Sequence, residues 1–106
     1  MTITKKQNGT TLELALNGRL DTMTAPELEK ELASVLKGVS ELTLDFENLD
    51  YISSAGLRVL LWAQKAISAE GTMKVRNVDE AVMDIFEVTG FSEILTIENT
   101  EEKTGE

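Results

Sequence analysis

The stretch that decides the fold is Leu49-Asp50-Tyr51-Ile52-Ser53-Ser54-Ala55-Gly56-Leu57-Arg58-Val59-Leu60-Leu61. It passes from an apolar strand, through two adjacent serines, into a strongly apolar helix. Serine is favoured at a helix start because its side-chain oxygen accepts from the free backbone N–H groups of the first turn. We therefore expect a helix from Ser54 to about Ala69, stopped by Gly71.

A serine hydroxyl at this place is exposed and lies beside the partial positive charge of the helix N-terminus. Such a position accommodates a phosphate well. The serines could equally be ordinary capping residues with no further role. The two interpretations are compatible, because Ser54 can cap the helix and carry a phosphate through the same N–H groups.

The residues before this stretch predict two antiparallel strands, 2–6 and 11–16, joined at Asn8-Gly9, a strong hairpin-turn signal. The second strand alternates with three leucines on one face and is broken or bulged at Asn17-Gly18.

The first predicted helix begins at Thr24, with Glu27 completing a capping box and Pro26 in the first turn, and it ends at Gly38. A third strand, 41–46, follows, and 47–50 is a polar connection to the opening stretch.

Beyond the central helix, 72–76 predicts a fourth short strand. A further helix is capped at Asn77, with Glu80 three residues later, and ends at Gly90. Its inner face consists of Val82, Ile85, Phe86 and Thr89. Residues 93–97 form a last, edge strand.

The order ββαβαβαβ predicts an α/β fold with a mixed sheet of four or five strands and helices packed against it. An N-terminal antiparallel hairpin precedes parallel strands joined by right-handed crossovers. We expect a single domain over 1–98 and a flexible acidic tail over 99–106.

Composition narrows the classes of function. The 106 residues include no cysteine and no histidine, so thiol chemistry and the commonest general base are absent. The 19 acidic against 10 basic residues argue against nucleic acid or anionic lipid as partners. No apolar run approaches the roughly 20 residues of a membrane span, and the N-terminus lacks a signal-peptide core. We expect a soluble cytoplasmic protein that is monomeric when unbound.

Two catalytic or metal constellations can be weighed. Asp45, Glu47 and Asp50 could bind a hard cation, but their spacing matches no calcium loop. Ser54 and Lys65 would lie about 16 Å apart along one helix, too far for a nucleophile and its base. We therefore predict no enzymatic activity, no metal and no cofactor.

One polar line runs along the central helix, consisting of Ser54, Arg58, Trp62, Lys65 and Ala69. Trp62 either bends back into the margin of the core or anchors a partner, since Trp and Arg are enriched in interface hot spots. A phosphate on Ser54 would add a charge of about −1.5 to −2 to any surface that binds there. Asp50, and Asp21 if its loop lies alongside, would sharpen the repulsion.

Three motifs over about residues 2–98 resemble the STAS-domain family, in particular bacterial anti-sigma factor antagonists. These motifs are Gly18-Arg19-Leu20-Asp21, Ile52-Ser53-Ser54-Ala55-Gly56-Leu57, and Asn77-Val78 with Phe86-Glu87-Val88-Thr89-Gly90-Phe91. The family's usual middle motif is Asp-Ser-Ser/Thr-Gly-Leu, with the phosphorylated serine at the helix N-terminus. Ser53 falls on the Asp, Ser54 on the first hydroxyl residue and Ala55 on the second.

The resemblance implies that Ser54 is the phosphate acceptor, with Ser53 as the alternate, and that Asp21, Thr22, Ser53, Ser54, Arg58 and Trp62 bind the partner. It further implies a partner switch. The unmodified protein binds an anti-sigma factor, a serine kinase, and so frees sigma. The kinase then phosphorylates the antagonist and ends the complex, and a PP2C-type phosphatase resets it.

Two alternatives remain open from the sequence. The chain could be a STAS interaction module of another assembly, such as a transporter subunit or a stress-signalling complex, with its serines unmodified. A weaker alternative is a domain that binds a small ligand or nucleotide.

Overall fold

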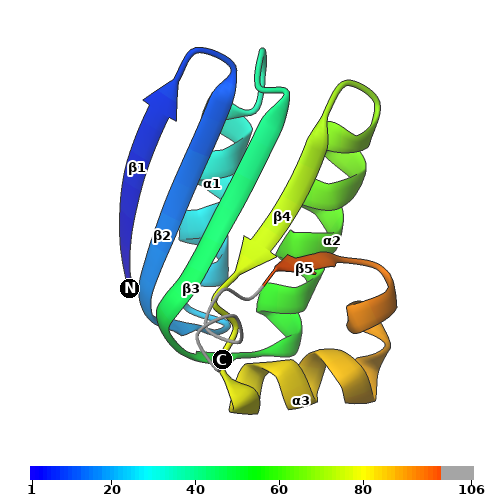
Figure 1. Cartoon of the computed structure of the whole chain (residues 1–106). Coiled ribbons are helices and arrows are strands. Elements are labelled where there is room, and N and C mark those ends of the chain that lie inside the picture. Colours follow the sequence, from blue (N-terminus) through cyan, green and yellow to red (C-terminus); the bar gives the residue numbers. More distant parts are fainter. Residues whose placement is uncertain (99–106) are drawn as a thin grey trace, which may run out of the picture.

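The computed structural model describes residues 1–98 (Figure 1). The predicted tail, 99–106, lies outside the described residues. The elements, in chain order, are β1 Thr2–Asn8, β2 Thr11–Leu20, α1 Ala25–Val35, β3 Glu41–Ile52, α2 Ser54–Ser68, β4 Thr72–Arg76, α3 Glu80–Thr89, the 3₁₀ turn η1 Phe91–Glu93 and β5 Thr96–Glu98. The predicted order ββαβαβαβ is confirmed.

The five strands form one mixed sheet in the order β1-β2-β3-β4-β5. β1 is antiparallel to β2, and each later neighbour is parallel to the one before it. The hairpin turns at Gly9, whose φ of +66° is one that glycine adopts without strain. Parallel strands require crossover connections, and α1, α2 and α3 provide them.

The core lies between one face of the sheet and the helices. α1 and α2 run side by side behind the sheet in Figure 1, and α3 lies across its lower end. Alternate side chains of the central strands are buried against this layer, namely Leu12, Leu14, Leu16, Leu42, Leu44, Phe46, Met73 and Val75. The ring of Phe46 meets that of Phe86 on α3 at 6.4 Å between centroids, which ties α3 to the sheet.

The third strand is longer than the sequence pattern predicts. Residues 47–50, predicted as a polar connection, continue β3 to Ile52. The prediction was wrong because β2 and β3 shift register after Ala15 and after Gly18, and those irregularities break the alternation of buried residues. Leu49 and Ile52 are nevertheless buried, so the extension delivers the chain directly to the serines.

Two predicted helix caps are corrected. Thr24 flanks α1 but makes no capping hydrogen bond, so the Thr24–Glu27 capping box does not form. Its hydroxyl turns back to β2 instead, donating to the Arg19 carbonyl at 2.7 Å. At α3 the cap is Asp79, whose carboxylate accepts from the Val82 N–H at 2.9 Å. Asn77, the predicted cap, has a positive φ of 57° and donates through its side chain to Asp45.

The inner face of α3 is narrower than predicted. Val82 and Phe86 are fully buried and Ile85 is half-buried, whereas Thr89 is exposed and donates to the Ile85 carbonyl.

The last strand also begins later than the predicted residue 93. The N–H groups of Ile94 and Leu95 donate to the Phe91 carbonyl, which keeps this segment in a turn until Thr96. Within residues 1–98, no helix is long and apolar enough to cross a membrane.

Candidate functional site

Ser53, not Ser54, caps α2. Its backbone is extended, with ψ at 176°, and its N–H donates to the Leu20 carbonyl at 2.9 Å, which holds it to the end of β2. Its hydroxyl oxygen accepts from the Gly56 N–H at 3.4 Å, and its carbonyl accepts the first intrahelical bond, from Leu57. The expectation that Ser54 caps the helix is therefore wrong.

Ser54 is the first helical residue and is exposed. Among the residues that the structure describes, none forms a hydrogen bond with its hydroxyl. Backbone N–H groups of the first helical turn have no partner within the helix and carry its partial positive charge. Ser54 thus has a free hydroxyl at the positive end of a helix.

The polar line along α2 is confirmed. Ser54, Arg58, Lys65 and Ala69 are all exposed. Trp62 is 36% exposed, so it is neither a core residue nor a fully solvated one. The exposed part of Trp62 leaves room for a contact with a partner, and its role as an anchor stays a prediction.

A groove of about 400 Å³ lies between the N-terminal parts of α1 and α2. Its lining combines apolar surface with one carboxylate and one guanidinium, and consists of Thr22, Ala25, Pro26, Glu29, Ala55, Arg58, Val59 and Trp62. Three of the predicted partner-binding residues, Thr22, Arg58 and Trp62, are thus brought together on one concave surface. Ala55 joins them, and Ser54 directly precedes it in α2.

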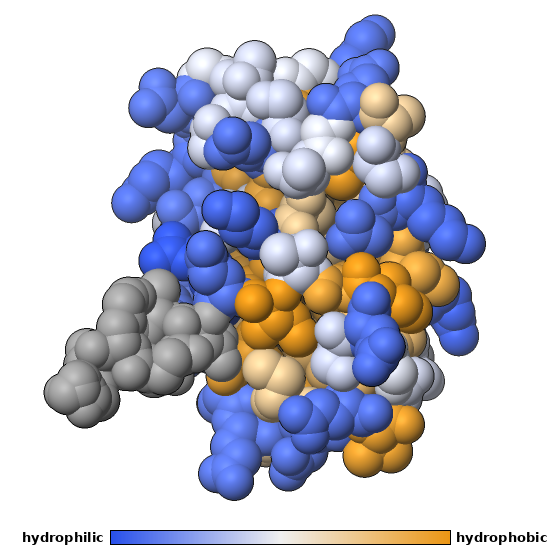
Figure 2. Space-filling view, turned by 45° about the vertical axis from the view of Figure 1, so that its right-hand side comes forward, coloured by the Kyte–Doolittle hydropathy of each residue, from blue (hydrophilic) through white to orange (hydrophobic). Residues whose placement is uncertain are grey.

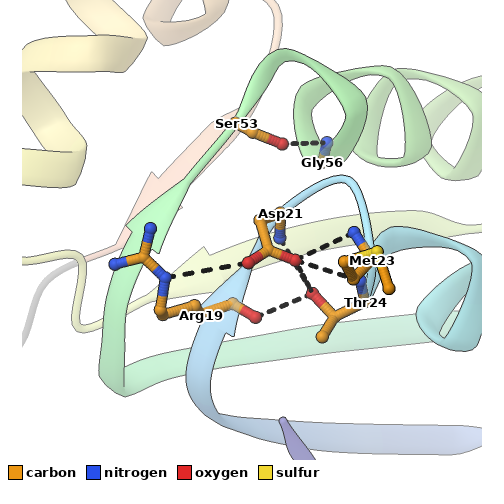
Figure 3. A network of polar contacts seen from close by, with 6 residues as sticks. All are labelled: Arg19, Asp21, Met23, Thr24, Ser53 and Gly56. Carbon is orange, nitrogen blue, oxygen red and sulfur yellow. Dashed lines mark hydrogen bonds and ion pairs between the residues drawn. The ribbon is translucent and has the colours of Figure 1, made fainter.

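Asp21 organises the loop between β2 and α1 (Figure 3). Its carboxylate accepts from the N–H groups of Met23 and Thr24 at 3.0 and 3.1 Å. The Thr24 hydroxyl oxygen in turn accepts from the Asp21 N–H at 2.8 Å. These bonds fix the turn that carries Thr22, which lines the groove together with Ala55 of α2.

Hydrogen bonding lowers the pKa of Asp21 from its ordinary value, chiefly through the Thr24 backbone N–H. The Thr24 hydroxyl, the Met23 N–H and the Arg19 charge act in the same direction, while partial desolvation opposes them. Asp21 therefore remains ionised over the physiological range and contributes a fixed negative charge to this loop.

Arg19, Met23 and Tyr51 lie in or next to the loop of Asp21, but they were not among the predicted partner-binding residues. The Arg19 guanidinium lies 4.4 Å from the centroid of the Tyr51 ring, and its Nε lies 3.7 Å from the Asp21 carboxylate. Met23 is 81% exposed. A methionine between two threonines in a loop is the one sequence signal that could have marked Met23, whereas the Arg19–Tyr51 pair depends on the shifted β2–β3 register.

The residues weighed as cation ligands do not form a site in the described part of the chain. Asp45 accepts from the Glu47 N–H and from the Asn77 side chain, each at 3.0 Å. Over residues 1–98, no group of three or more acidic ligands could hold a metal ion.

Comparison with known proteins identifies the family. The family model described as "Mlab, STAS domain" matches residues 3–96. A Bordetella bronchiseptica protein named as a candidate anti-sigma factor antagonist, BtrV, is 39% identical over 89 residues, covering 82% of this chain and 77% of that protein. The anti-sigma-B factor antagonist of Bacillus subtilis is 27% identical over 93 residues, covering 87% of this chain and 85% of that protein.

Solved structures show the same fold. The Bacillus anti-sigma factor antagonist SpoIIAA, known in unphosphorylated and phosphorylated forms, superposes with TM-scores of 0.74 and 0.72 at 18% identity. The phosphorylated form covers 98% of this chain and 97% of its own. The chain belongs to the STAS-domain family, and curated relatives are named as anti-sigma factor antagonists.

Proposed function

We propose that this protein is an anti-sigma factor antagonist controlled by phosphorylation of Ser54. The unmodified form binds an anti-sigma factor serine kinase through the α1–α2 groove and the Asp21 loop, and sigma is thereby freed. Phosphorylation of Ser54 ends the complex, and a PP2C-type phosphatase restores the binding form. The protein acts in the cytoplasm as a substrate and a binding module rather than as an enzyme.

The free hydroxyl of Ser54 is the observation that carries this proposal. Ser54 is exposed at the N-terminus of α2, while its neighbour Ser53 provides the cap. A kinase can therefore reach one hydroxyl without opening the helix. The relatives named as antagonists, and the existence of a phosphorylated SpoIIAA structure, support the same assignment.

The direct test is incubation with candidate anti-sigma kinases and ATP, followed by mass spectrometry. We expect one phosphate on Ser54, absent from Ser54→Ala and retained in Ser53→Ala. The Ser53→Ala variant is the matched control, because it removes the adjacent hydroxyl and the cap but leaves the acceptor. Modification of other residues only, or no modification by any cognate kinase, would refute the switch and favour a STAS module of another assembly.

The charge of the phosphate should matter more than the loss of the hydroxyl. We expect Ser54→Asp to weaken binding of the kinase at least about tenfold, because the new charge must be desolvated or face a like charge in the complex. Ser54→Ala should bind nearly as the unmodified protein does. Equal affinities of the two variants, measured by calorimetry, would contradict an electrostatic off-switch.

A further inference from the structure

The last part of the described chain is uniformly acidic. Residues 77–98 contain no lysine or arginine and carry six carboxylates, on Asp79, Glu80, Asp84, Glu87, Glu93 and Glu98. Asp79 caps α3, and Glu98 lies 3.9 Å from Lys74. Within residues 1–98, Asp84, Glu87 and Glu93 form no ion pair, and all three are exposed.

Two aliphatic side chains are exposed among these carboxylates. Val88 is 86% exposed and Ile94 is 47% exposed, and half-buried Phe91 lies between them in the sequence. Figure 2 brings forward the side of the molecule that carries η1 and the end of α3, and apolar atoms gather in its lower half between hydrophilic groups. Val88 is too exposed to contribute to the core, so the fold does not explain its apolar side chain.

The backbone holds these side chains in a fixed arrangement. Gly90, with a φ of +85°, ends α3 directly after Thr89 and reverses the chain. The Glu93 N–H donates to the Gly90 carbonyl and the Leu95 N–H to the Phe91 carbonyl, which closes the η1 turn. η1 and α3 also contact each other. We call the exposed set Asp84, Glu87, Val88, Glu93 and Ile94 the α3–η1 surface.

We propose that the α3–η1 surface is a second docking site, which binds a protein segment with lysine or arginine side chains beside an apolar one. Three carboxylates that lack ion-pair partners within residues 1–98 are complementary to such cations, and Val88 and Ile94 supply the apolar area that a charged surface alone would lack. A second copy of this chain fits poorly, since carboxylates would face carboxylates and the net charge is −9.

This site is separate from the groove beside Ser54. The α1–α2 groove is lined by residues 22–29 of the α1 region and 55–62 of α2, and no residue of α3 or η1 lines it. The basic segment should therefore remain bound in both states of Ser54. A partner held at the α3–η1 surface could thus stay attached while the kinase complex forms and ends.

The test uses the full chain labelled with ¹⁵N and a synthetic amphipathic helix of leucine and lysine as the probe. We expect chemical-shift changes centred on residues 84–94, and no comparable set with a matched leucine–glutamate peptide. Replacing Val88→Ser and Ile94→Ser together should weaken binding about tenfold, since both apolar contacts are lost. Glu87→Gln should weaken it less and reduce its salt dependence.

Matched controls keep the test specific. Met23→Ser removes an apolar side chain about as exposed as Val88 from the loop between β2 and α1, and Trp62→Ala alters the α1–α2 groove. Both variants should therefore bind the leucine–lysine peptide with unchanged affinity. Ser54→Asp should also leave the affinity for the peptide unchanged. This expectation does not depend on whether a kinase modifies Ser54. Shift changes centred on the groove or spread over all acidic surfaces, or unaltered binding by the Val88→Ser/Ile94→Ser variant, would overturn the proposal. A dimer in sedimentation that Val88→Ser dissociates would assign the surface to a second copy instead.

Discussion

Two adjacent hydroxyls at the start of α2 have different tasks. Ser53 is held by Leu20 of β2 and accepts from the Gly56 N–H, so a phosphate there would cost the helix its cap. Ser54 makes no such bond to the described residues, and its modification leaves the cap in place. This division of tasks is the physical reason why we propose Ser54, and not Ser53, as the phosphate acceptor.

Asp21 gives a pH-dependent prediction. Its pKa is lowered in the fold, so the ionised carboxylate stabilises the native state above its unfolded value of about 3.9, and this contribution is lost as pH falls through the lower, folded value. We expect Asp21→Asn to be less stable than the unmodified chain at pH 7, with the difference shrinking below about pH 4. Urea denaturation across this range measures it.

Asp50→Asn is the control for this titration. Asp50 is an exposed aspartate near the end of β3, and the structure gives its side chain no hydrogen bond within residues 1–98. We expect that replacement to change the free energy of unfolding little at pH 7. A difference for Asp21→Asn that stayed constant down to pH 3 would mean that its charge does not hold the loop.

At the level of elements, the entry of α2 depends on a close approach to the sheet. A Cβ on Gly56 would lie 2.8 Å from Ile52 Cγ1 and 2.8 Å from Leu20 Cγ. Alanine improves helix propensity by about 1 kcal/mol, whereas overpacking a filled core costs about 1–3 kcal/mol. Because both contacts are to buried side chains near their branch points, the overpacking cost should lie at about 2–3 kcal/mol. After the gain in helix propensity, we expect Gly56→Ala to destabilise the protein by about 1–2 kcal/mol in chemical denaturation.

A double-mutant cycle isolates the contact. Leu20→Ala removes one of the clashing carbons, so the Leu20→Ala/Gly56→Ala double variant should lose less stability than the two single variants added together. Strict additivity would show that Gly56→Ala acts through something other than this contact.

Strands and helices were predicted where side-chain periodicity is clean, as for β4 and for the leucines of β2. The extension of β3 was missed because Glu47, Asn48 and Asp50 look like a loop when the strand carries register shifts. The caps were misassigned for a related reason. Thr24 and Asn77 are favourable capping residues by type, but their side chains form hydrogen bonds elsewhere. Thr24 donates to the carbonyl of Arg19, which precedes it in the chain, and Asn77 donates to Asp45, which is distant in the sequence.

For the whole molecule, phosphorylation should change an interface and not the fold. Because Ser54 is exposed and its hydroxyl is uncommitted among the described residues, a phosphate adds no clash, and the helix N-terminus should favour it by about 0.3–1 kcal/mol. We expect the thermal midpoint to shift by only a few degrees on phosphorylation, upward if at all. A broad loss of native chemical shifts would show that the switch works by refolding.

The candidate site, which comprises the start of α2, the Asp21 loop and the α1–α2 groove, was predicted only in part. The polar line of α2 follows from helical spacing, and the family motifs pointed to the loop of Asp21 and Thr22. The groove itself could not be foreseen, because it depends on how α1 and α2 lie against one another. Arg19 and Tyr51 were missed since they become neighbours only through the register of β2 with β3.

The tight packing at Gly56 has a consequence for comparing family members by sequence. The glycine of the Ser-Ser-Ala-Gly-Leu motif is required here by Leu20 and Ile52, which have no part in phosphate chemistry. A homologue that has lost its phosphorylation site should therefore keep this glycine as long as it keeps the sheet. The glycine of the motif therefore reports on packing between α2 and the sheet, and its presence in a homologue says nothing about phosphorylation.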